Sequence, residues 1–124
     1  MSSRLPHPIP YQGSKRALAP LIGAHVPRGI DVWFEPFAGS AAMTLWAIHN
    51  RIARRYVIAD VLELIPPLLH AIIDKPDATA ERYRLVWVGQ HDGDGDYFNR
   101  VRARYNASHD PVDLLYLICR CVKN

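Results

Sequence analysis

Residues 34–42 read Phe-Glu-Pro-Phe-Ala-Gly-Ser-Ala-Ala, and mostly apolar residues flank this stretch on both sides. The order predicts a strand over residues 31–36, a tight turn, and a helix over residues 40–52. Small residues in such a turn let a ligand approach the backbone, and the helix N-terminus that follows offers unpaired N–H groups. In an open α/β sheet, nucleotide-like ligands bind at this position. The stretch therefore indicates both a fold class and a place for a ligand.

The next segments continue the pattern. Residues 55–60 read Arg-Tyr-Val-Ile-Ala-Asp and predict a second strand, which ends in a carboxylate. A helix is expected over residues 61–73, with regular geometry starting near Pro67, because proline is tolerated in a first turn but not inside a helix. The alternation of strand and helix predicts an α/β fold with a parallel sheet of Rossmann-like type.

The rest of the chain reads as helix. Residues 15–18, after Ser14 as N-cap, and residues 21–26 predict short helices that Pro20 separates. Longer helices are expected over residues 78–88 and 97–106, and from Pro111, with Asp110 as N-cap, to the end of the sequence.

Two recognisable parallel strands cannot bury both faces and both edges of a sheet. We therefore expect an incomplete sheet: residues 1–13 form an N-terminal arm, and residues 14–124 form part of a larger α/β domain.

Composition excludes several classes of protein. Hydrophobic residues make up 49% of the 124 residues, which favours a globular core. We find no apolar run near the roughly 20 residues that span a bilayer, and the Pro-rich N-terminus is unlike a secretory signal, so no membrane association and a cytoplasmic location are expected.

No metal is expected either. Cys119 and Cys121 are too few for a zinc site and read as reduced thiols. A calcium loop starting at Asp92 would need glycine and glutamate where Tyr97 and Ala103 stand.

Charge is uneven along the chain. Residues 1–62 hold 7 Lys and Arg against 3 Asp and Glu (+4), and residues 63–124 hold 8 against 9 (−1), which sums to the net charge of +3. A basic N-terminal half is compatible with nucleic acid but is also common on solvated surfaces. The arginines at 82, 84, 100, 102 and 104 spread around their helices, which favours solvated surfaces over a phosphate-binding face.

Two groups of residues could bind a ligand. Asp60 follows Gly39 by 21 residues, a spacing that suits a carboxylate at a ribose, although Asp60 could equally cap the next helix. In the loop that precedes the first strand, Tyr11 could stack on a ring and Lys15 could bind a carboxylate or phosphate. The alternative there is an exposed arm that leads into a capped helix.

Taken together, three motifs resemble the DNA adenine methylase family. They are Tyr-x-Gly-x-Lys at residues 11–15, Phe-Glu-Pro-Phe-x-Gly-Ser at residues 34–40, and Tyr-Val-Ile-Ala-Asp at residues 56–60. Residues 96–106 and 110–124 are similar to helices of the same family, so the resemblance covers residues 8–124. It implies methyl transfer from S-adenosyl-L-methionine to the exocyclic amino nitrogen of adenine, with double-stranded DNA as partner.

The resemblance also implies a cofactor-binding set. In the first motif, Tyr11 would pack on the cofactor and Lys15 would hold its carboxylate. Glu35 would face the cofactor's amino group or order the loop, and Asp60 would bind the ribose. The family often has Asp-x-Asn here, whereas this chain has Leu62 at the last position. The full set is Tyr11, Lys15, Phe34, Glu35, Pro36, Phe37, Ala38, Gly39, Ser40 and Asp60.

The resemblance supplies no catalytic residue. Members of the family use an Asp-Pro-Pro-Tyr type motif to hold the target base, and the 124 residues contain none. Ile65-Pro66-Pro67-Leu68 has the prolines only and reads as a helix entry. We therefore expect an N-terminal fragment, or one half of a split enzyme that a second polypeptide completes, inactive alone. The alternative is a non-catalytic remnant that binds a cofactor or a protein partner.

Overall fold

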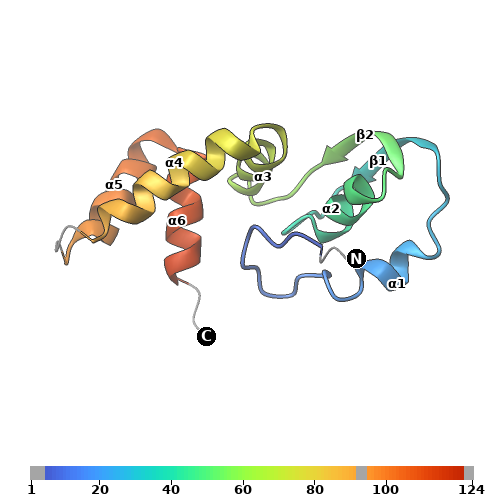
Figure 1. Ribbon diagram of the computed structural model, residues 1–124, viewed down its shortest axis with the longest axis horizontal. Coiled ribbons are helices and arrows are strands. Elements are labelled where there is room, and N and C mark those ends of the chain that lie inside the picture. The colour runs from blue at the N-terminus through green and yellow to red at the C-terminus, as the bar shows by residue number, and fades with distance from the viewer. Residues whose placement is uncertain (1–4, 92–94, 122–124) are drawn as a thin grey trace. The chain divides into compact units, whose positions relative to one another are not determined.

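The computed structural model describes residues 5–91 and 95–121, which form two compact units, residues 1–66 and residues 67–124. Its described part holds a two-stranded parallel sheet and six helices (Figure 1), so the predicted α/β class with an incomplete sheet is confirmed. No helix among the described residues is long and apolar enough to cross a membrane.

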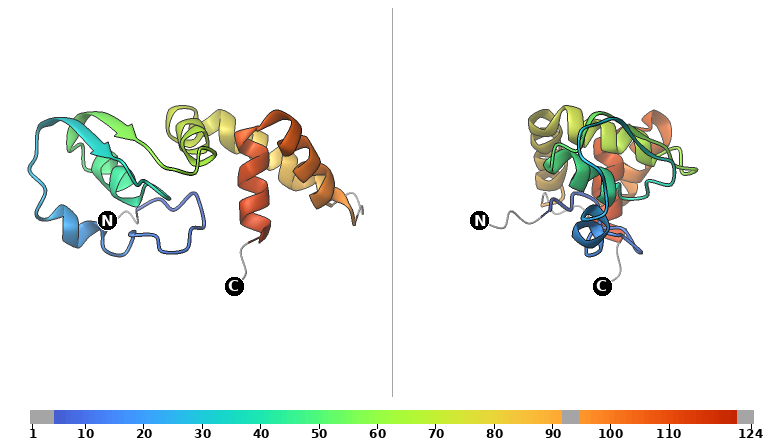
Figure 2. Two further views of the ribbon diagram at one scale, coloured as in Figure 1. Left: turned by 180° about the vertical axis from the view of Figure 1, so that it is seen from behind. Right: turned by 90° about the vertical axis from the view of Figure 1, so that its right-hand side faces the viewer.

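Unit 1 contains the predicted strand–helix–strand arrangement. Its elements in chain order are α1 (Ala19–Gly23), β1 (Ile30–Glu35), α2 (Ala42–His49) and β2 (Ala53–Ile58). The strands run parallel, with Trp33 opposite Tyr56 and Glu35 opposite Ile58. Helix α2 makes the connection and lies alongside the sheet, as the views in Figures 1 and 2 agree. Both strands therefore end at the same edge of the sheet, where the turn before α2 also lies.

Helix α2 covers one face of this sheet. The indole Nε1–H of Trp33 donates to Thr44 Oγ1 at 3.0 Å, and the hydroxyl of Tyr56 donates to the carbonyl of Ala47 at 3.2 Å. Neighbouring strand residues point to opposite faces. The other face accordingly carries Val32, Phe34 and Val57, which are exposed. Among the described residues, the sheet of unit 1 is thus covered on one side only, by α2.

From residue 5 onward, the loop before α1 packs within unit 1 rather than extending from it. The side chain of Ile9 is fully buried, and the guanidinium of Arg16 donates to the carbonyl of Leu5 at 2.6 and 2.9 Å. The separate helices predicted over residues 15–18 and 21–26 were wrong. Pro20 stands in the first turn of α1, where its missing N–H has no intrahelical partner to lose, so it opens the helix instead of interrupting it.

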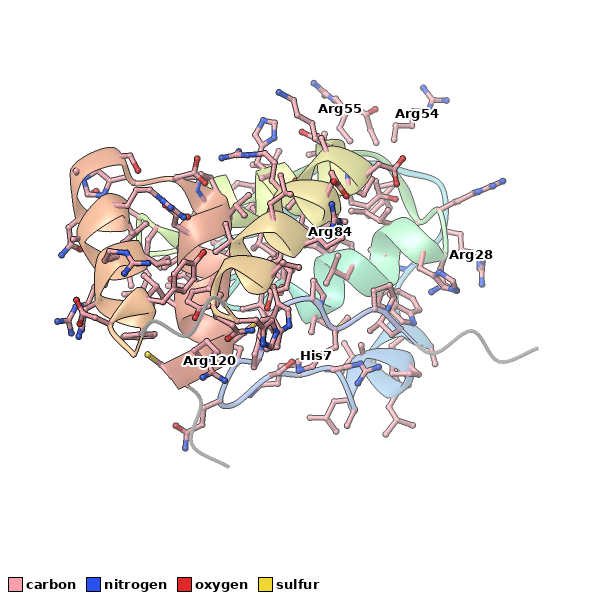
Figure 3. All side chains as sticks on the ribbon, turned by 60° about the vertical axis from the view of Figure 1, so that its left-hand side comes forward. His7, Arg28, Arg54, Arg55, Arg84 and Arg120 are labelled. Carbon is pink, nitrogen blue, oxygen red and sulfur yellow. The ribbon has the colours of Figure 1, made fainter. Side chains whose placement is uncertain are left out.

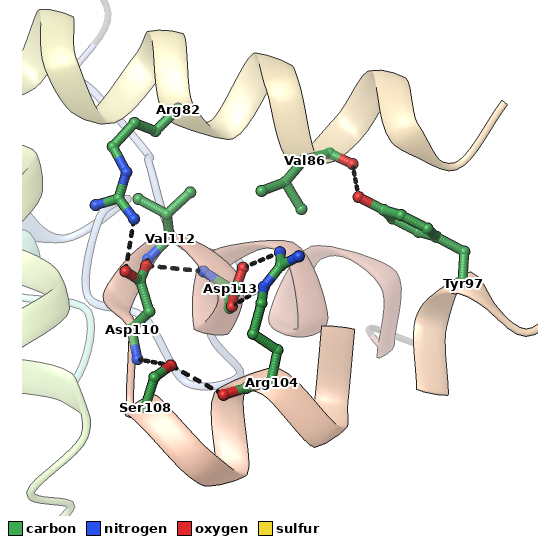
Figure 4. A network of polar contacts seen from close by, with 8 residues as sticks. All are labelled: Arg82, Val86, Tyr97, Arg104, Ser108, Asp110, Val112 and Asp113. Carbon is green, nitrogen blue, oxygen red and sulfur yellow. Dashed lines mark hydrogen bonds and ion pairs between the residues drawn. The ribbon is translucent and has the colours of Figure 1, made fainter. Parts of the chain in front are cut away.

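Unit 2 is helical, with α4 (Pro76–Gly89), α5 (Tyr97–Ser108) and α6 (Pro111–Cys121) following α3 (Ile65–Asp74). Val101, Tyr116 and Leu117 form a buried cluster against which aromatic side chains such as Tyr97 and Phe98 pack. The predicted entry to α6 is confirmed, because Asp110 Oδ1 accepts the backbone N–H of Val112 at 2.8 Å (Figure 4).

Candidate functional site

A pocket of about 340 Å³ lies at the carboxyl ends of β1 and β2, entirely within unit 1. This is the edge of a parallel sheet at which ligands bind in α/β proteins. Its walls come from the loop before α1, the turn between β1 and α2, and the segment after β2. The lining residues are Tyr11, Gly13, Ser14, Lys15, Glu35, Phe37, Ala38, Gly39, Ser40, Ala42, Asp60, Val61 and Leu62.

Gly39 is the residue around which the turn is built. Its φ of +49° lies in the left-handed region, which glycine adopts without steric cost. A Cβ at this position would lie 3.1 Å from the Tyr11 ring, so the loop before α1 packs directly on the turn. The backbone N–H of Gly39 donates to Asp60 Oδ2 at 2.8 Å, which ties the turn to the end of β2.

Asp60 holds the segment after β2 as well. Its Oδ1 accepts the backbone N–H of Leu62 at 2.9 Å, and the two backbone donors hold the pKa of Asp60 below its usual value. Helix α3 begins only at Ile65, so Asp60 does not serve as its N-cap. The carboxylate therefore organises both sides of the pocket mouth and stays ionised there.

A pair of hydroxyls joins the loop before α1 to the turn. Ser40 Oγ donates to Ser14 Oγ at 3.0 Å, and Ser14 Oγ also accepts the backbone N–H of Arg16 at 3.4 Å. Ser40 is buried. The motif at residues 11–15 and the motif at residues 34–40 thus form one continuous wall.

Glu35 ends β1 and reaches the first turn of α2. Its Oε2 accepts the backbone N–H of Thr44 at 2.9 Å and also the Thr44 hydroxyl. Burial raises the pKa of Glu35, although the hydrogen bonds from Thr44 oppose that shift. The pocket therefore holds two carboxylates whose pKa values move in opposite directions.

The remaining wall is apolar and open, with one cation. Phe37 and Val61 are 87% and 88% exposed, and Leu62 is also exposed, so their side chains offer apolar surface to a ligand. Lys15 Nζ donates to the carbonyl of Gly13 at 3.2 Å and is otherwise exposed. Such a site suits a small molecule with a flat apolar part and a charged end.

Comparison with known proteins identifies the family of the chain. A family model of the D12 class N6 adenine-specific DNA methyltransferases matches residues 11–124. The chain belongs to this family. Over 118 residues it is also 26% identical to the type II methyltransferase M.FokI of Planomicrobium okeanokoites. That alignment covers 95% of this chain but only 18% of the relative, so the chain spans about a fifth of the relative's length.

In this chain of the D12 family, the residues of the expected cofactor-binding set line the pocket with two exceptions. Phe34 and Pro36 are not among the lining residues. Phe34 points to the face of the sheet opposite to that of Glu35 and is exposed there. The lining residues outside the expected cofactor-binding set are Gly13, Ser14, Ala42, Val61 and Leu62. Val61 and Leu62 follow Asp60, two residues beyond the end of β2, and their place after a predicted strand end is the sequence signal for them.

The arginines of the D12 chain are mostly engaged within their own unit. In unit 2, Arg82 pairs with Asp110 and Arg104 pairs with Asp113 (Figure 4), while Arg84 pairs with Glu81. In unit 1, Arg55 of β2 pairs with Asp31, and Arg28 and Arg54 extend outward into solvent (Figure 3). The side chains of Arg82, Arg84 and Arg104 remain more than half exposed on their helices.

No cluster of three or more metal-ligating side chains occurs among the described residues. The acidic stretch considered as a calcium loop lies partly at residues 92–94, outside the described residues. Cys119 is partly buried, Cys121 is exposed, and neither forms a disulfide.

Proposed function

We propose that the pocket of unit 1 binds S-adenosyl-L-methionine as the methyl donor for N6 methylation of adenine in DNA. The observation that carries the proposal is that Gly39 contacts both the Tyr11 ring and the Asp60 carboxylate. These three residues come from three separate motifs of the sequence. Membership of the D12 family supports the reaction class.

The residues present fit the chemical groups of this cofactor. Asp60 can accept hydrogen bonds from ribose hydroxyls, because its oxygens have further lone pairs beyond the two backbone contacts. Phe37, Val61 and Leu62 provide apolar surface for the adenine ring. Lys15 and Glu35 provide a cation and an anion for the charged amino-acid end.

In this mechanism, the cofactor supplies an electrophilic methyl group on a positively charged sulfur. The chain's own residues bind and orient that donor. A left-handed glycine leaves room for close approach at the turn, where a side chain would press on Tyr11. The groups that hold the acceptor base are proposed to lie outside these 124 residues, which contain no Asp-Pro-Pro-Tyr type motif.

Calorimetric titration of the purified chain with S-adenosyl-L-methionine tests the pocket. We expect the wild type to bind, Asp60→Ala to lose about tenfold or more in affinity, and Gly39→Val to lose binding altogether. Gly95→Ala is the matched control, because a Cβ there meets open space. Wild-type affinity in both pocket variants would contradict the assignment.

A methyl-transfer assay on DNA tests the remaining part of the proposal. The chain alone is expected to give no turnover, since positioning the acceptor amino group contributes much of the rate. Activity that appears on adding a second polypeptide with an Asp-Pro-Pro-Tyr type motif would support a split enzyme. Robust turnover by the chain alone would overturn this part.

A further inference from the structure

Trp33, Thr44 and Glu35 form a hydrogen-bonded row behind the pocket, and its direction is fixed by chemistry. The indole Nε1–H of Trp33 can only donate, so Thr44 Oγ1 accepts from it at 3.0 Å. The single hydroxyl hydrogen of Thr44 is then directed to Glu35 Oε2, which also accepts the Thr44 backbone N–H at 2.9 Å. Oε2 is therefore an acceptor of two hydrogen bonds.

The second oxygen of Glu35, Oε1, takes no part in these contacts. Both contacts given above use Oε2, and no buried side-chain oxygen among the described residues lacks a hydrogen-bond partner. Oε1 is consequently accessible to solvent, and Glu35 lines the pocket. One oxygen is thus held by helix α2, and the other is free to accept a hydrogen bond from a ligand.

Thr44 is well placed to hold this arrangement. Its side chain is 1% exposed, so its hydroxyl exchanges no hydrogen bonds with water. It stands in the first turn of α2, while Glu35 ends β1, so the contact fixes the strand end to the helix start. Without the hydroxyl, only the backbone N–H of Thr44 would hold Oε2, and a less firmly oriented carboxylate loses affinity for a partner that needs one orientation.

We propose that Thr44 is a positioning residue, supported by Trp33, that orients Glu35 so that Oε1 receives the α-ammonium group of bound S-adenosyl-L-methionine. This rests on the proposed function of the pocket. It assigns a role to two residues that do not line the pocket themselves. An ammonium donor matches Oε1 because a charge-assisted hydrogen bond to a carboxylate is stronger than a neutral one.

The test compares Thr44→Val with Thr44→Ser in the full chain, by calorimetric titration with two ligands. S-adenosyl-L-methionine carries the ammonium group, and 5′-methylthioadenosine keeps the nucleoside but lacks the whole amino-acid part. We expect Thr44→Val to lose about tenfold in affinity for the first ligand and to keep its affinity for the second. Thr44→Ser keeps the hydroxyl and should restore affinity to within about threefold of wild type.

Trp33→Phe provides a second variant if Thr44→Val does not fold. It removes the indole donor but keeps an aromatic ring on β1, and we expect about a threefold loss for S-adenosyl-L-methionine alone. Equal losses for both ligands, or no loss in any variant, would overturn the positioning role while the pocket assignment stands. A wild-type chain that binds neither ligand would instead overturn the proposed function and this inference with it.

Discussion

At the scale of single residues, the pKa values of the two pocket carboxylates are shifted in opposite directions. The backbone N–H groups of Leu62 and Gly39 lower the pKa of Asp60, whereas burial raises the pKa of Glu35. As pH falls, Glu35 is therefore protonated before Asp60. The two groups are proposed to bind different parts of one ligand, so their contributions can be separated by pH.

The first prediction follows from this order. Affinity for S-adenosyl-L-methionine should fall as pH drops through the raised pKa of Glu35, because protonation removes the anion that faces the ammonium group. Asp60 stays ionised in that window, since its pKa lies below the usual value of 3.8. The charged or titratable side chains that share the pocket with them are Lys15 and Tyr11.

Titration calorimetry at several pH values from neutral down to the ordinary glutamate value of 4.5 measures the effect. Glu35→Gln should bind weakly at neutral pH and should show no loss on acidification. An unchanged pH profile in Glu35→Gln would assign the loss to another group.

The protonation of Glu35 also affects the stability of unit 1, and its pH dependence is opposite to that of ligand binding. Its folded-state pKa is raised, so the folded state binds the proton more tightly than the unfolded chain. The stability of unit 1 should therefore decrease as pH rises from the unfolded value of 4.5 through the folded pKa. Binding and stability would thus favour different protonation states of the same residue, as expected of a functional group rather than a structural one.

A second residue-scale prediction concerns unit 2. The Asp113 side chain is 4% exposed, and Arg104 Nε donates to its Oδ2 at 2.6 Å as part of a two-bond pair (Figure 4). Arg104→Met leaves a buried carboxylate without its cation, and we expect a loss of about 1–3 kcal/mol in the free energy of unfolding. The lower part of the range reflects the half-exposed guanidinium, where water replaces some of the interaction.

Urea denaturation of the full chain measures this loss. Arg102→Met, on the exposed surface of the same helix, is the matched control and should change stability by less than about 0.5 kcal/mol. A similar loss in both variants would point to helix propensity rather than to the ion pair.

At the scale of elements, α1 and α2 meet through a glycine. A Cβ on Gly23 would lie 2.1 Å from the Trp46 ring, far inside contact distance, and a rigid indole has little freedom to withdraw. Gly23→Ala should therefore destabilise unit 1 by about 1–3 kcal/mol, although alanine is the better helix former. Thermal unfolding followed by circular dichroism measures the change. Gly95→Ala, where a Cβ meets open space, should leave the midpoint unchanged.

Elements with a strong pattern could be predicted from the sequence. The strand observed as Ile30–Glu35 was expected at residues 31–36, and its partner Ala53–Ile58 at residues 55–60, because apolar runs between turn residues define them. The entry to α6 followed from the Asp-Pro pair at residues 110–111. The extent of α1 could not be read in the same way, since Pro20 fits both the start and the end of a helix.

In the candidate site too, residues with a local sequence pattern could be predicted, and contacts between distant residues could not. Gly39 and Asp60 could be predicted because the role of a turn glycine, or of a carboxylate after a predicted strand, can be inferred from the neighbouring residues in the sequence. The Ser14–Ser40 hydrogen bond could not be found, since it joins residues 26 apart whose hydroxyls are ordinary in sequence. The link from Trp33 through Thr44 to Glu35 was hidden for the same reason, because it depends on how α2 lies against β1.

At the scale of the whole molecule, the chain divides into two units with separate cores. All residues that line the pocket belong to unit 1, and the buried cluster around Tyr116 belongs to unit 2. A ligand that binds only unit 1 contributes its binding free energy to the stability of that unit. The effect of the cofactor should therefore be uneven along the chain.

Hydrogen exchange of the full chain with and without S-adenosyl-L-methionine tests this division. At a ligand concentration about 100 times Kd, opening of unit 1 should become about 2.7 kcal/mol less favourable, which slows exchange about a hundredfold in α2, β1 and β2. Amides of α4, α5 and α6 should exchange at unchanged rates, because these helices provide none of the lining residues. In Gly39→Val, adding the ligand should no longer slow exchange in unit 1, and exchange in unit 2 should stay unchanged. Equal slowing in both units would mean that they open as one body, and the ligand's stabilisation would then be a property of the chain rather than of its pocket.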